Sequence, residues 1–378
     1  MAGANLEESC VQYQDQRLEE GGAVRAARGE VFVRSLIAGI GALLLAAPVS
    51  GHHSDSGLDL DTLVTVEGTV TDFSWRNPHV YFTVEATDEE GTQVEWTIQM
   101  ASVATVSRMG WTSDSLAVGD QVAIGAYPAR DGRAYAKFLS IEKSDGIALP
   151  TSFDSETGEV LLSAPEVTAS TTTLEGKWMA DGSALNEYPG RLDGLTRALL
   201  RLTEDGRARQ AAYDENSDEN PELRCVGRPT PAMIVYTDLY PLQIEFSEAE
   251  KTIAIRSQFF DEERTVYVDG RGHPEGQRFH EGHSIGWWEG NTLVIDTRHF
   301  TDHRSPYQNG IPSGAQKHVM ERYQLNEDGT RMIVEFTLED PEYILEPMTH
   351  TRELIYSPQA DMSPFNCDPE STRRFRAR

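Results

Sequence analysis

Lysine is scarce in this chain of 378 residues, and basic residues are outnumbered overall. Five lysines belong to a set of 33 basic residues, which face 61 acidic residues and leave a net charge of −28. Binding to nucleic acid requires Lys and Arg clustered against the phosphate backbone, so this balance excludes a nucleic-acid partner. An acidic surface with few lysines is typical of salt adaptation, although a GC-rich genome also favours Arg over Lys.

Long apolar runs are also missing, with one short exception near the start. Leu36–Val49 is apolar over fourteen residues, which is short for a membrane span and typical of the core of a signal peptide. Arginines precede this run, and small residues at 49–51 offer a cleavage site. We therefore predict a leader over 1–51, no membrane span in the mature chain, and a periplasmic or secreted location. The alternative is an uncleaved signal anchor.

Cysteine is nearly absent, and its placement agrees with export. Cys10 lies in the predicted leader, which leaves Cys225 and Cys367 as an even pair in the mature chain. In an oxidising compartment such a pair predicts a disulfide, with two free thiols as the alternative. The chain lacks C-x-x-C, which argues against a redox role. It also lacks a phosphate-binding glycine loop, a dinucleotide fingerprint and H-E-x-x-H.

Residues 52–149 predict a small OB-like barrel of five strands. Three alternating segments come first, Ser102 then caps a short helical segment, and two more strands follow. The order β-β-β-α-β-β is that of the OB-fold. Six basic and fifteen acidic residues between 52 and 150 argue against nucleic-acid binding by this domain. The apolar positions that alternate are Val64, Val66, Val70, Val80, Phe82, Val84, Val94, Trp96, Ile98, Val122 and Ile124.

A linker over 150–174 separates this domain from a second one over 175–378, which predicts an all-β antiparallel meander. Strands recur about every ten residues with short turns between them, and a long meander closes into a barrel because closure removes its edges. Gly176-Lys177-Trp178 is similar to the Gly-x-Trp of lipocalins, so we expect a lipocalin-like barrel; the alternative is a two-layer sandwich. The expected strands are Met233–Thr237, Leu242–Phe246, Thr252–Ser257, Arg264–Asp269, Ser284–Trp288, Thr292–Thr297, His318–Gln324, Met332–Leu338 and His350–Tyr356.

Both halves resemble exported bacterial families without an assigned activity. The first half carries the start His52-His53-Ser54 and the segment Trp75-Arg76-Asn77-Pro78-His79, which resemble an exported domain of unknown function over about 52–148. The second half resembles another uncharacterised exported family through the segment Trp288-Glu289-Gly290-Asn291-Thr292-Leu293-Val294-Ile295-Asp296-Thr297. These resemblances imply architecture and export, and they imply no reaction.

The predicted cleavage site suggests a copper site. Cleavage after Gly51 makes His52 the new N-terminus, where the amine and the imidazole can chelate Cu(II), which favours nitrogen ligands. His53 or His79 would complete the site. The alternative is a frayed terminus with His79 capping a turn.

The second domain holds the other histidines and the candidate catalytic groups. His280-x-x-His283 and His299-x-x-x-His303 superficially match zinc pairs, but their flanks predict strand and turn instead of a helix. The sequence GHSIG at 282–286 lacks the strand–turn–helix context of a serine hydrolase. Alternation along the expected strands suggests a polar interior group for acid–base work. Its candidates are His283, Asp296, His318 and Glu321.

Three functions are compatible with these patterns. The first is binding of a small, partly apolar ligand in the C-terminal barrel, with Trp287, Trp288, Tyr323 and Phe336 as the aromatic contacts. The second is an acid–base enzyme, such as a hydratase, isomerase or hydrolase, in that barrel. The third is metal handling, with copper at the processed terminus. We favour the first.

Overall fold

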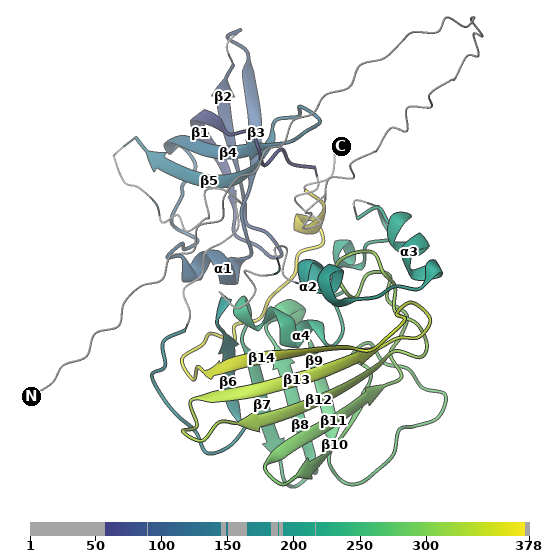
Figure 1. Cartoon of the computed structure of the whole chain (residues 1–378). Helices are drawn as coiled ribbons and strands as arrows, with labels where there is room; N and C mark the ends of the chain where they lie inside the picture. The colour runs from purple at the N-terminus through teal and green to yellow at the C-terminus, as the bar shows by residue number, and fades with distance from the viewer. Residues whose placement is uncertain are drawn as a thin grey trace, which may run out of the picture. The chain divides into compact units, whose positions relative to one another are not determined.

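The computed structural model describes residues 57–88, 90–144, 149, 165–182, 188, 192–215 and 217–374, all of which belong to one compact unit of the chain. The protein is all-β, with a closed barrel of five strands followed by a closed barrel of nine, as the sequence predicts (Figure 1). The predicted leader over 1–51 and the start of the predicted linker lie outside the described residues. Residues 165–174 of that linker hold no helix or strand.

The first barrel has the strand order of an OB-fold. Strand β1 pairs with both β2 and β4, and β3 pairs with β5 in parallel, which closes the order β1-β2-β3-β5-β4. The Ser102 hydroxyl accepts a hydrogen bond from the Thr105 amide at 3.3 Å and so caps the helix as predicted. The elements are β1 (Val64–Ser74), β2 (Tyr81–Thr87), β3 (Gln93–Gln99), α1 (Val103–Arg108), β4 (Gln121–Pro128) and β5 (Tyr135–Lys143).

The second barrel is a meander in which each strand pairs with the next and β14 returns to β6. Eight of its neighbouring pairs are antiparallel, and β9 and β10 are parallel. A closed barrel with an odd number of strands cannot alternate direction throughout, so one pair must be parallel. The strands are β6 (Gly176–Ala180), β7 (Leu242–Ser247), β8 (Thr252–Ser257), β9 (Glu263–Tyr267), β10 (His283–Glu289), β11 (Thr292–Arg298), β12 (His318–Leu325), β13 (Arg331–Glu339) and β14 (Met348–Tyr356).

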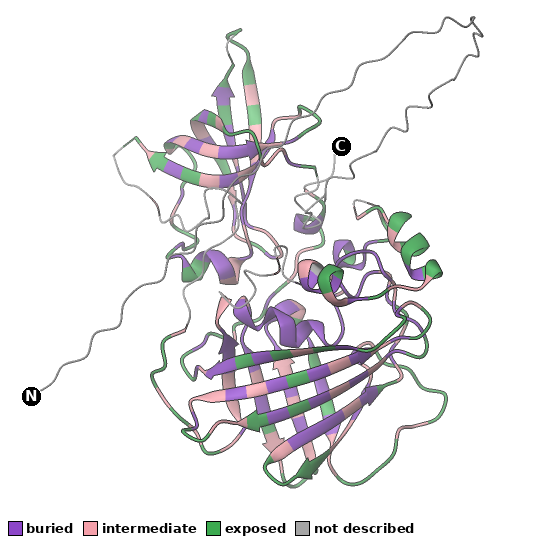
Figure 2. Cartoon of the chain, viewed as in Figure 1, coloured by how far each residue is buried: buried purple, intermediate pink, exposed green. Residues whose placement is uncertain are grey.

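Buried residues alternate with more exposed ones along strands of this barrel (Figure 2). In β12, Val319, Glu321 and Tyr323 are buried, while Arg322 between them is exposed. In β11, Leu293 and Ile295 belong to the apolar core. The two-residue period of a strand thus divides each sequence segment into an inner and an outer face.

The expected strand over Met233–Thr237 is wrong. These residues form the helix α4 (Ala232–Val235) and a 3-10 turn, Tyr236–Asp238, within the long connection from β6 to β7. Every residue of α4 is buried. A short apolar run that is buried on all sides has no polar face to reveal its period, so a buried helix and a buried strand look alike in sequence. The same connection holds α2 (Leu192–Leu199), α3 (Glu204–Ala211) and the 3-10 turn Pro221–Arg224.

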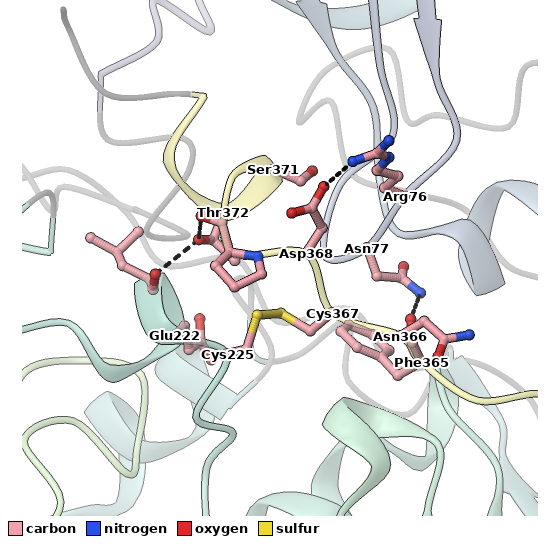
Figure 3. Close-up of a disulfide and its surroundings, with 12 residues drawn as sticks. Arg76, Asn77, Glu222, Cys225, Phe365, Asn366, Cys367, Asp368, Ser371 and Thr372 are labelled. Carbon is pink, nitrogen blue, oxygen red and sulfur yellow. Dashed lines mark hydrogen bonds and ion pairs between the residues drawn. A yellow bond between two sulfur atoms is a disulfide. The ribbon is translucent and has the colours of Figure 1, made fainter.

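The predicted disulfide joins Cys225 to Cys367, with 5.8 Å between their Cα atoms (Figure 3). The bond fixes the C-terminal segment to the connection between β6 and β7. The Arg76 guanidinium donates to Asp368 at 2.7 Å, and the Asn77 amide donates to the carbonyl of Phe365. The C-terminal segment is therefore tied to the second domain covalently and to the first domain by polar contacts.

Candidate functional site

The centre of the nine-stranded barrel holds a buried ion pair. Glu321 receives hydrogen bonds from both terminal nitrogens of Arg264, one at 2.8 Å, and from the Tyr323 hydroxyl at 2.7 Å. The two charged side chains are 1% and 0% exposed. Glu321 and Tyr323 are therefore interior, as their alternation suggests. Hydrogen bonds to both carboxylate oxygens explain how the barrel tolerates the buried Glu321, because an unpaired carboxylate would cost several kcal/mol.

Lys317 directly precedes β12. It continues the alternation of the buried residues Val319, Glu321 and Tyr323, so it belongs to the inner face of the barrel. Its side chain is buried, and its ammonium nitrogen has no hydrogen-bond partner among the described residues. That nitrogen lies 4.2 Å from the centre of the Phe300 ring and 5.3 Å from that of Tyr307. Burial lowers the pKa of Lys317 to about 7, although Glu281 and Asp340 favour its charge. An amine in such surroundings is available to a ligand or a proton.

Three further polar atoms are buried and lack hydrogen-bond partners within the described part of the chain: Glu281 Oε1, Asp340 Oδ1 and the Tyr307 hydroxyl. Glu281 and Asp340 act electrostatically on the Lys317 ammonium, and the Tyr307 ring lies beside it. Together with Lys317 we call them the Lys317 cluster. Burial raises the pKa of Asp340 to about 6, even though the Gly314 amide donates to its other oxygen at 2.7 Å. Each unsatisfied buried polar atom costs about 1–3 kcal/mol, so four in one place require an explanation.

The topology explains why these residues meet. Glu281 precedes β10, Lys317 precedes β12, and Asp340 follows β13. In a meander, the start of one strand and the end of the next lie at the same end of the barrel. The connection from β11 to β12, which carries Tyr307, lies at that end as well. The Lys317 cluster is therefore assembled at one end of the barrel from segments far apart in sequence.

A second polar group adjoins the cluster through Glu281. His280 Nε2 lies 3.2 Å from Glu262 Oε1 and 3.9 Å from Glu281 Oε1. Burial raises the pKa of Glu262 to about 8; His280 opposes this rise and Glu281 adds to it. Nearby, His303 donates from Nε2 to the carbonyl of Gly227 at 3.0 Å and accepts from an amide at Nδ1. This pairing makes His303 neutral, and burial lowers its pKa to about 3.

The other three candidate catalytic residues lie together on the outer face of the barrel. Asp296 Oδ1 lies 3.0 Å from His318 Nε2 and 3.4 Å from His273 Nε2, and His273 Nδ1 lies 2.9 Å from His283 Nδ1. The expectation that His283, Asp296 and His318 share the interior with Glu321 is therefore wrong. They belong to the strand positions opposite to Leu293, Ile295 and Val319, which fill the core.

The parallel pair β9–β10 accounts for this outer group. The connection between parallel neighbours must run back along the barrel outside the sheet, and it carries His273 onto the outer face. Bonding to Asp296 raises the pKa of His318. Burial opposes the ionisation of Asp296, but His318 and Arg298 outweigh it and lower its pKa to about 2. His318 and Asp296 thus form an ion pair at mildly acidic pH. His280 and His283, which match a zinc spacing, belong to separate groups.

The four predicted aromatic contacts divide between two places. Tyr323 and Phe336 are fully buried in the barrel core. Trp287 and Trp288 are 39% and 47% exposed, near the hairpin at the end of β10. Trp288 packs edge-on against Phe246, with 6.2 Å between ring centres. The two tryptophans thus lie at the barrel end opposite to the Lys317 cluster.

The predicted copper site is described only in part. His52 and His53 lie outside the described residues. His79 is half-buried, its Nδ1 lies 3.1 Å from the carbonyl of Met100, and its own carbonyl accepts from the Ser371 hydroxyl. Copper binding at the processed terminus therefore stays a prediction.

Comparison with known proteins gives one family match. Residues 42–138 match a model described as a family of unknown function, DUF6152. The match covers most of the five-stranded barrel, ends within β5, and includes none of the nine-stranded barrel. No curated protein matches the chain. Within the described residues, the structure contains no helix of the length and apolarity that a bilayer crossing requires.

Proposed function

We propose that this protein is exported and binds a small, partly apolar molecule at the Lys317 cluster of the nine-stranded barrel. The observation that carries the proposal is the set of four buried polar atoms that lack partners in the described structure: Lys317 Nζ, Glu281 Oε1, Asp340 Oδ1 and the Tyr307 hydroxyl. They come from three separate segments, because Tyr307 and Lys317 both belong to the connection between β11 and β12. A bound polar group would satisfy them together, at the point where each segment leaves the barrel.

The chemistry of the cluster indicates what such a molecule must offer. Lys317 donates hydrogen bonds, and the free oxygens of Glu281 and Asp340 accept them. The ligand therefore needs an acceptor, such as a carbonyl or hydroxyl oxygen, beside a donor. The rings of Phe300 and Tyr307, which lie next to the Lys317 nitrogen, suit an apolar part of the same molecule.

Export is supported by two separate features. The apolar run before residue 50 with its preceding arginines is typical of a signal peptide. The bond between Cys225 and Cys367 belongs to an oxidising compartment, because cytoplasmic thiols are kept reduced. A periplasmic or secreted location therefore accords with both the leader and the fold.

Acid–base catalysis at the same cluster is the second candidate function. Lys317 with a pKa of about 7 and Asp340 with a pKa of about 6 would exchange protons near neutral pH. Groups that titrate near the working pH are the most effective general acids and bases. Buried ionisable groups in structural networks also have shifted pKa values, so this feature favours catalysis less strongly than the unpartnered atoms favour binding.

Native mass spectrometry of the protein purified from its own periplasm tests the proposal. We expect a non-covalent small-molecule adduct on the wild type that Lys317→Met loses. The exposed Lys251 provides the control, since Lys251→Met should retain the adduct. Wild type without an adduct, or an equal adduct on Lys317→Met, would contradict the binding proposal. Catalysis would be shown if the wild type converts the recovered molecule and Lys317→Met does not.

A further inference from the structure

We propose that Glu262, His280 and Glu281 form a binding site for a divalent transition-metal ion. One donor atom from each residue lies within 4.8 Å of the other two. His280 Nε2 is 3.2 Å from Glu262 Oε1 and 3.9 Å from Glu281 Oε1. Donor atoms that share a metal at about 2.1 Å lie roughly 3–4 Å apart, so these spacings need little adjustment.

The orientation of the Glu281 side chain supports the metal site independently of the donor spacings. Its side chain is 6% exposed, and Oε2 accepts hydrogen bonds from the Thr230 amide at 2.9 Å and the Thr230 hydroxyl at 2.8 Å. Oε1 is buried and has no hydrogen-bond partner in the described chain, and it is the oxygen that faces His280. One oxygen is therefore held in place while the other is directed, unpartnered, toward the site. Such outer hydrogen bonds are how proteins orient metal ligands.

The backbone brings the three ligands together through the parallel pair. Glu262 directly precedes β9, and Glu281 lies two residues before β10. Because β9 and β10 run in the same direction, the residues before them meet at the same end of the barrel. Gly227 makes room for Glu262, since a Cβ atom at Gly227 would lie 2.1 Å from Glu262 Oε1.

The donor set indicates the kind of ion. One imidazole nitrogen beside two carboxylate oxygens suits Zn²⁺, whereas Ca²⁺ and Mg²⁺ prefer oxygen alone. Three protein ligands leave one position of a tetrahedral ion open to water or another molecule. The His280 side chain is 34% exposed, which provides a route from solvent. The ion would therefore be exchangeable.

Zinc titration of the full-length, chelator-treated protein tests this site. By calorimetry we expect the wild type to bind one zinc equivalent that both His280→Ala and Glu281→Gln lose or bind at least about 100-fold more weakly. Gln at 281 can still accept from Thr230, so its fold should persist. Thr230→Val, which removes only the supporting hydroxyl, should weaken binding about 10–100-fold. Co²⁺ in place of zinc should give a visible absorption band in the wild type that His280→Ala lacks.

Two controls separate this site from its neighbours. His273→Ala alters the outer-face histidine group and should keep the zinc equivalent. Lys251→Met changes an exposed residue in the turn between β7 and β8 and should bind zinc as the wild type does. The metal proposal is read from His280 and the ligand proposal from Lys317, so the two can fail separately. The metal proposal is overturned if His280→Ala and Glu281→Gln bind zinc as the wild type does, if only His273→Ala loses it, or if the wild type binds none.

Discussion

The ammonium nitrogen of Lys317 lies 4.2 Å from the centre of the Phe300 ring, inside the protein and without a hydrogen-bond partner among the described residues. The ring attracts the cation, but a cation–π contact of about 2 kcal/mol does not replace the hydration that a buried ammonium loses. Lys317 is therefore expected to lower the stability of the barrel in which it lies.

Lys317→Met should accordingly raise the free energy of unfolding at pH 7 by about 1–3 kcal/mol, because Met fills similar volume without an unsatisfied donor. Urea denaturation measures this, with Lys251→Met expected within about 0.5 kcal/mol of the wild type. A stabilised variant that loses its ligand would identify Lys317 as a functional residue. A clearly destabilised Lys317→Met would instead assign Lys317 to structural support.

The stability gained by Lys317→Met should depend on pH. An unfolded lysine holds its proton below about 10.5, whereas folded Lys317 holds it only below about 7. The unfolded state therefore binds more protons between these values, so this residue makes the wild type less stable as pH falls from 10.5 to 7. The difference in the free energy of unfolding between wild type and Lys317→Met should therefore grow as pH falls over that range. Parallel stability curves for the two proteins would contradict the pKa assignment.

Glu321→Gln should destabilise the barrel, because it leaves Arg264 buried without a charged partner. Breaking one side of a buried ion pair costs about 3–5 kcal/mol. Tyr323→Phe, which removes one hydrogen bond to the same carboxylate, should cost only about 1–2 kcal/mol. Urea denaturation of the two variants checks the order. An effect of Glu321→Gln no larger than that of Tyr323→Phe would show that the ion pair contributes little.

The outer-face pair of His318 and Asp296 should stabilise the fold within a limited pH window. The pKa of His318 is raised, so its contribution is complete below about 6.5 and is lost as pH rises through its folded pKa. The pKa of Asp296 is lowered to about 2, so its contribution is present above about 3.8 and is lost as pH falls toward 2. His318→Gln should therefore cost most, about 1 kcal/mol, between pH 4 and 6.5.

Denaturation of wild type and His318→Gln at pH 3, 5.5 and 9 measures this window. Glu339 also bonds His318 Nδ1 at 3.0 Å, so Glu339→Gln serves as the control for the second carboxylate. A stability difference that does not change between pH 5.5 and 9 would show that His318 acts through packing and not through its charge.

The fold could be predicted from local pattern, because both barrels depend on two-residue alternation and short turns. The same alternation placed Glu321 and Tyr323 inside. It does not show which face of β11 is the inner one, since Val294 and Ile295 are equally apolar, and Asp296 lies on the face opposite to the expected one. The alternation of β12, extended backward by two residues from Val319, would have pointed to Lys317.

The candidate site itself could not be predicted, because it depends on which strand ends meet. Glu262 and His280 are eighteen residues apart in the sequence and belong to different segments. Their contact follows from the parallel pairing of β9 with β10, which the sequence does not signal. Glu281 in turn needs Thr230, which comes from the connection before β7. Closure of the barrel and the path of its connections therefore decide the site.

The bond between Cys225 and Cys367 should contribute strongly to stability, because it closes a loop across 142 residues of sequence. In the chain-entropy model a loop of this length is worth about 4–5 kcal/mol. The protein should gain two hydrogens in intact mass on reduction, and its free energy of unfolding should fall by up to that amount. Cys225→Ala with Cys367→Ala should reproduce the loss without reductant.

The contacts of Arg76 with Asp368 and of Asn77 with Phe365 depend on the same segment, so limited proteolysis of the double variant should cut near residue 367 first. Two thiols that alkylate readily in the native protein would contradict both the bond and the proposed oxidising location.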